Sequence, residues 1–104
     1  EMDMKEHFND LEPDEHERLS LLMEECAELI MVVGEILRHG YETCHPNSGL
    51  VNRLLLERKC GHLRNAMIFM CEAGDMEESV IRYHADVHAK AMIQSLHHQG
   101  EQET

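Results

Sequence analysis

Apolar residues recur every three or four positions along three long segments of this chain, and this spacing marks one face of an α-helix. Strand-like alternation is not a feature of the sequence, so the pattern predicts an all-α fold. The first helix is expected from about 14 to 39, because Pro13 precedes an acidic turn and Gly40 follows Arg38 and His39. These residues are typical of the two ends of a helix.

Turn chemistry separates the remaining helices. The run YETCHPNSG at 41–49 predicts a loop, a second helix is expected from about 50 to 73, and Gly74 should end it. Asp75 is then expected to cap a third helix that ends near 97. This divides the chain into an N-terminal arm (1–12), a helical domain (13–98) and a flexible tail (99–104).

Charge and composition limit the classes of partner. The 104 residues suit one domain, and a formal net charge of -12 argues against duplex nucleic acid and anionic membranes as partners. The sequence has no apolar run of about 18 residues, so no membrane span is expected. Four cysteines without CxxC spacing and without a secretory leader indicate a reduced chain, for which a cytoplasmic location is expected.

The predicted helices are long for so small a core. A helix of about 24 residues spans about 36 Å, and an antiparallel bundle of three such rods leaves one groove open. We therefore expect a homo-oligomer, a dimer or a tetramer, that completes the bundle.

Viewed along its axis, each predicted helix has its apolar residues on one side, which we call its apolar arc. Charged residues interrupt this arc on two of the helices. Glu25 falls inside the arc of the first helix and Glu28 lies at its edge, one turn further on. On the second helix Lys59 lies among leucines, with His62 one turn away. Because a buried, unpaired charge is costly, the two helices are expected to face each other through these residues, across a cation or an ion pair.

Four motifs extend this pattern into a resemblance. The sequence is similar to MazG-like all-α nucleoside triphosphate pyrophosphohydrolases in EECAE at 24–28, ILRHGY at 36–41, NR at 52–53 and CEAGD at 71–75. The resemblance covers residues 15–98. It implies a helical bundle that hydrolyses a nucleoside triphosphate to the monophosphate and pyrophosphate, with Mg²⁺ or Mn²⁺ held by an EExxE motif and an ExxD motif.

The second half of that ligand set departs from the family pattern. Glu25 and Glu28 match the first motif, whereas Lys59 and His62 stand at the ExxD positions, and Glu57 faces the other side of the helix. Two interpretations stay open. Either Lys59 replaces the charge of the metal, or His62 joins Glu25 and Glu28 around a softer metal such as Mn²⁺, Ni²⁺ or Zn²⁺ while Lys59 contacts a substrate phosphate.

In the chemistry that the resemblance implies, Glu24 would orient the attacking water. Arg38 and Arg53 stand near helix ends, where they would either reach nucleotide phosphates or form surface ion pairs with the abundant acidic residues. The sequence thus predicts a MazG-like pyrophosphohydrolase whose activity is weakened or lost through the change of ligands. The alternative is a non-catalytic helical protein that oligomerises or senses nucleotides on the same scaffold.

Overall fold

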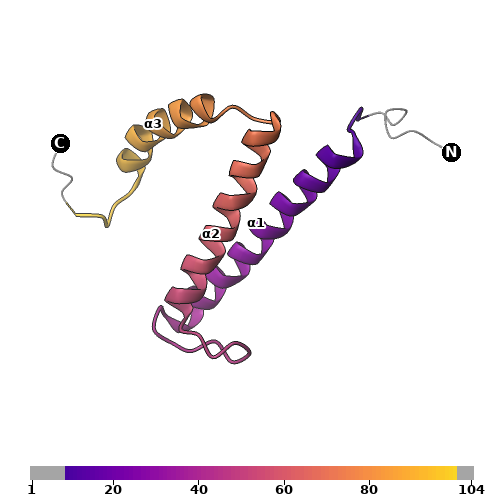
Figure 1. Cartoon of the computed structure of the whole chain (residues 1–104). Coiled ribbons are helices and arrows are strands. Elements are labelled where there is room, and N and C mark those ends of the chain that lie inside the picture. The colour runs from indigo at the N-terminus through magenta and orange to yellow at the C-terminus, as the bar shows by residue number, and fades with distance from the viewer. Residues whose placement is uncertain (1–8, 101–104) are drawn as a thin grey trace.

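The structure is a computed structural model that describes residues 9–100, and within this range it consists of three helices joined by two connections. Helix α1 spans Pro13–His39, α2 spans Asn52–Ala73 and α3 spans Glu78–Ser95. Figure 1 shows α1 and α2 joined at one end by a loop, with α3 extending away from this pair. The all-α prediction is confirmed for the described residues. Most of the predicted arm and the last four residues of the tail lie outside them.

Local chemistry accounts for the ends of the first two helices. Pro13 is the first residue of α1, and the backbone N–H of Glu12 donates to Glu15 Oε1 at 2.7 Å, so one helix-end donor is satisfied. Gly74 ends α2 with φ of 91°, in the left-handed region that glycine adopts without strain. These helices therefore end where the sequence predicted, within two residues.

The start of the third helix differs from the prediction. Asp75 does not cap α3, which begins at Glu78 with Glu77 in the capping position. Instead, the Asp75 carboxylate accepts hydrogen bonds from Arg18 Nε at 2.6 Å and Arg18 Nη2 at 3.0 Å. This two-bond ion pair joins the beginning of α1 to the end of α2, and a nearby arginine is a stronger partner for a carboxylate than a backbone N–H.

The core lies between α1 and α2. Among the described residues, the buried apolar side chains are Val32 of α1 and Leu55, Ala66 and Met70 of α2. The Arg18–Asp75 pair lies at one end of this hairpin and the contact of Asn52 with Gly40 at the other, so the two helices run antiparallel. This pairing of α1 with α2 positions every site described below.

Helix α3 buries none of its residues, and the described part of the chain shows no extensive packing of α3 against α1 or α2. Most of its large apolar side chains are exposed to solvent, as are several on α1, including Ile30, Met31 and Leu37, whereas Ile81 is half-buried. The three-helix bundle and its completion by oligomerisation therefore remain predictions. Within the described residues, no helix is both long and apolar enough to cross a membrane.

The loop between α1 and α2 is held by backbone hydrogen bonds. An antiparallel bridge pairs Cys44 with Val51, and His45 N–H donates to the Leu50 carbonyl at 2.7 Å. Two further N–H groups at the start of α2, those of Asn52 and Arg53, donate back to the loop at 2.9 and 2.8 Å. The loop thus has a defined conformation next to the end of α1.

Candidate metal and nucleotide site

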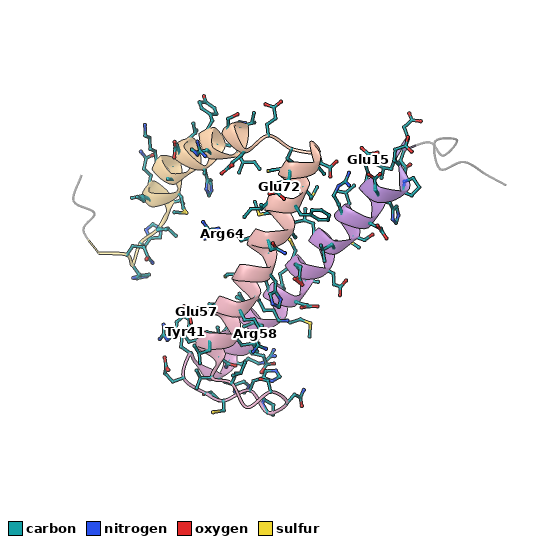
Figure 2. The ribbon with its side chains drawn as sticks, viewed as in Figure 1. Glu15, Tyr41, Glu57, Arg58, Arg64 and Glu72 are labelled. Atoms are coloured by element: carbon teal, nitrogen blue, oxygen red, sulfur yellow. The ribbon has the colours of Figure 1, made fainter. Side chains whose placement is uncertain are left out.

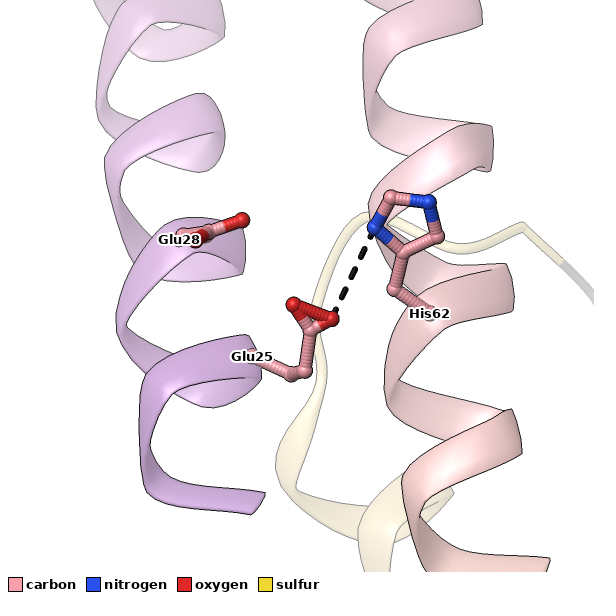
Figure 3. Close-up of side chains that lie close together, drawn as sticks. All are labelled: Glu25, Glu28 and His62. Atoms are coloured by element: carbon pink, nitrogen blue, oxygen red, sulfur yellow. Dashed lines mark ion pairs between the residues drawn. The ribbon is translucent and has the colours of Figure 1, made fainter. Parts of the chain in front are cut away.

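Two carboxylates and an imidazole converge between α1 and α2. Glu25 and Glu28 project from α1 and His62 projects from α2, and one ligand atom from each lies within 4.8 Å of the others (Figure 3). His62 Nδ1 lies 3.5 Å from Glu25 Oε2, and the Glu25 side chain is only 13% exposed. The spacing of one helical turn between Glu25 and Glu28 places both on the side of α1 that faces α2.

Lys59 is part of the same cluster. Its Nζ donates to Glu28 Oε1 at 2.7 Å, and both side chains are partly buried. This hydrogen bond, together with the positive charge of Lys59, lowers the pKa of Glu28 below its ordinary value. Glu28 is therefore ionised at neutral pH, with one carboxylate oxygen engaged by an ammonium.

The donor set fits a divalent transition metal better than Mg²⁺. Ligands on opposite sides of a small octahedral ion stand about 4 Å apart, so the three atoms need only a small adjustment to reach a common ion. Mg²⁺ prefers oxygen ligands, whereas Mn²⁺, Ni²⁺ and Zn²⁺ accept an imidazole beside carboxylates. Glu25, Glu28 and His62 are the residues that would hold such an ion, and Lys59 competes with it for Glu28.

A groove of about 610 Å³ extends from this cluster toward the loop. Basic side chains of both helices line it, namely Arg38 of α1 with Arg58 and Lys59 of α2, alongside the carboxylates of Glu28 and Glu35. Figure 2 shows Arg58 at the loop end of α2. We call this the basic groove. Lys59 and Arg38 are paired with its two carboxylates, and Arg58 is the cation of the groove with no ion-pair partner among the described residues, so it is the one most open to a phosphate.

Two of the predicted site residues lie elsewhere. Glu24 lines a separate hollow with Arg18 and Phe69, near the start of α1. The Arg53 guanidinium pairs with Glu42 at 2.7 Å and lies over the ring of Tyr41, 4.4 Å from its centroid. The water-orienting role of Glu24 and the phosphate contact of Arg53 therefore stay predictions.

Arg38 lines the basic groove as expected, but it is paired with Glu35, whose carboxylate accepts from Arg38 Nη2 at 2.6 Å. This hydrogen bond is the main cause that lowers the pKa of Glu35. Arg38 therefore has a partner that a phosphate would have to displace or share.

Sequence reasoning missed four polar residues of the groove, namely Glu35, Arg58, His45 and Ser48. Arg58 was detectable, because it lies one turn from Leu55 and therefore on the edge of the same helix face. His45 and Ser48 also line the groove, but they come from the loop. Their positions depend on how the loop folds back, which has no periodic signal in the sequence.

Comparisons with models of known protein families, with curated proteins and with solved structures find no match to this chain.

Proposed function

We propose that the chain is a MazG-like nucleotide pyrophosphohydrolase that cleaves a nucleoside triphosphate to the monophosphate and pyrophosphate, with activity weakened by Lys59 and His62. The observation that supports this proposal is the convergence of Glu25, Glu28 and His62 beside the basic groove. A cation-binding cluster next to clustered basic side chains is the combination that a polyphosphate needs in an acidic protein.

Each part of the site has a chemical task in this proposal. A divalent ion held by Glu25, Glu28 and His62 would supply Lewis-acid stabilisation and lower the pKa of a bound water. Arg58 and Lys59, which line the basic groove, would bind the phosphate chain next to the carboxylate cluster. Hydrolysis then adds water across the anhydride between the α and β phosphorus atoms, which yields the monophosphate and pyrophosphate.

Weak activity follows from the ion pair. Lys59 engages Glu28 at 2.7 Å, so an ion must share that carboxylate with an ammonium. The imidazole of His62 replaces a negative ligand by a neutral one, which lowers the attraction for Mg²⁺ further. We expect binding of Mn²⁺ to exceed binding of Mg²⁺, and calorimetric titration with each ion, with and without a non-hydrolysable nucleoside triphosphate, measures this directly.

Restoring the carboxylates tests the catalytic proposal. The double variant Lys59→Glu with His62→Asp should gain Mg²⁺-dependent release of pyrophosphate from a panel of nucleoside triphosphates. The matched control, Lys90→Glu with His88→Asp, makes the same two changes on exposed positions of α3. A folded double variant that releases no more pyrophosphate than this control would contradict the proposal.

The Lys59–Glu28 pair also favours a second candidate function. If the ammonium has taken the place of the metal, the scaffold serves oligomerisation or nucleotide sensing without catalysis. The same titration separates the two candidates. The second function requires that the nucleotide analogue, or another copy of the chain, binds without any dependence on a divalent ion.

A further inference from the structure

The wall that α1 contributes to the basic groove lacks a side chain at one position. Gly34 lies in the interior of α1 and lines the groove, so the helix backbone itself borders the space at this point. A Cβ atom built at Gly34 would meet nothing within 4 Å apart from its chain neighbours and its own helix backbone. Glycine is less favourable than alanine inside a helix, but here it leaves the groove open.

The neighbours of Gly34 on the helix surface show that this opening faces the groove. Met31 stands one turn before Gly34 and Arg38 one turn after it, and both line the groove. Residues three and four positions apart share one face of a helix. A side chain at position 34 would therefore project into the same space as Met31 and Arg38.

Apolar side chains form the floor of the groove beside this opening. Val32 and Leu55, which are 5% and 8% exposed, line it from the two helices, and Met31 is exposed at its edge. Its volume of about 610 Å³ is that of a small-molecule site, and such sites are mostly apolar with a few polar groups. Bare backbone above an apolar floor suits a flat ring, because no side chain stands in its way.

Charged groups indicate where the polar part of such a ligand would lie. Glu28 belongs both to the groove and to the metal-binding cluster, and Arg58 has no ion-pair partner among the described residues. Gly34 lies six residues beyond Glu28, which is about 9 Å further along α1 at about 1.5 Å per residue. A ribose that joins a phosphate chain to a base can span this separation, so charge and spacing both favour a nucleotide.

We propose that the basic groove binds the base of a nucleoside triphosphate flat against the α1 backbone at Gly34, with the phosphates toward Arg58 and the metal-binding cluster. This inference rests on the proposed nucleotide-binding function and adds the residue that makes room for the base. Any larger side chain at position 34 occupies the place of the ring.

Calorimetric titration in the presence of Mn²⁺ tests this assignment. The ligands are the α,β-methylene analogues of the four ribonucleoside triphosphates and of methyl triphosphate, which carries the same charge without a base. The tightest nucleotide should bind at least about tenfold more tightly than the methyl ester, the factor that burial of about 60 Å² of apolar surface gives. Gly34→Leu should remove this advantage and leave binding of the methyl ester unchanged.

Gly61→Leu is the matched control. Gly61 also lies inside a helix with open space at its Cβ position, but it is exposed and does not line the groove. Both variants should fold, because leucine has a higher helix propensity than glycine. The unaltered protein gives a second readout: with Zn²⁺ in place of the paramagnetic Mn²⁺, protons of the bound base should show nuclear Overhauser effects to the α protons of Gly34 and to the methyl groups of Leu55.

The possible failures differ from one another. A nucleotide advantage that survives Gly34→Leu, or the absence of contacts between the base and Gly34, overturns the proposal. Metal-dependent binding of the methyl ester without any nucleotide advantage rejects the base site and leaves the proposed metal and phosphate site intact, whereas no binding of any triphosphate rejects both. If a second copy of the chain fills the groove instead, Gly34→Leu changes the sedimentation profile while nucleotides gain no advantage, and this result also overturns the proposal.

Discussion

Replacing Lys59 by methionine should strengthen binding of a divalent ion by about 15- to 20-fold at low ionic strength. Lys59 Nζ lies 2.7 Å from Glu28 Oε1, and a metal bonded to that oxygen at about 2 Å would lie within about 5 Å of the ammonium. Repulsion between a dication and a single charge at that distance, even at the dielectric constant of water, accounts for this factor. Methionine keeps the length and apolar stem of the side chain, so packing changes little.

The assay is calorimetric titration with Mn²⁺ at two salt concentrations. The gain should shrink as the ionic strength rises, because the screening length falls to about 8 Å at physiological salt. Lys90→Met serves as the control, since it removes the same charge from an exposed position on α3. The reasoning is refuted if Lys59→Met binds Mn²⁺ no more tightly than the unaltered chain, or if Lys90→Met produces the same gain.

Three other predictions concern stability and assembly. Met70 is buried between α1 and α2, so Met70→Ala should lower the free energy of unfolding by about 2 to 5 kcal/mol in urea titration, and a change near zero would show that this interface does not hold the fold. Arg18 lowers the pKa of Asp75 below its ordinary 3.8, so the ion pair stabilises the fold above that value, and its contribution is lost as the pH falls through the lower pKa of the folded state. Thermal melts between neutral pH and pH 2 should show this loss, and Arg18→Gln should reduce the slope in that window; an unchanged slope would contradict the assignment. The many exposed apolar side chains predict self-association, so sedimentation at low micromolar concentration should show no 12.1 kDa species, and Ile30→Glu should produce one; a monomer in the unaltered protein would disprove the packing argument.

The helices and the pairing of charged residues were accessible from sequence because both depend on short-range geometry. Helix ends follow from residues such as Pro13 and Gly74, whose backbone preferences act locally. The position of Glu28 at the edge of one apolar arc and of Lys59 within another indicated that α1 and α2 would meet through them, and the structure places these two groups in contact. The roles of these residues in metal binding and catalysis remain proposals.

Tertiary structure decided the features that join distant parts of the chain. Asp75 resembled a helix cap in sequence, yet it binds Arg18, 57 positions earlier, because the antiparallel hairpin brings the two together. The conformation of the loop places His45 in the lining of the basic groove and packs Asn52 against Gly40. The sequence by itself determined that this chain forms three amphipathic helices, since hydrophobic periodicity is a property of neighbouring residues. Which charges pair depends on the register between α1 and α2, and that register exists only once the two helices pack.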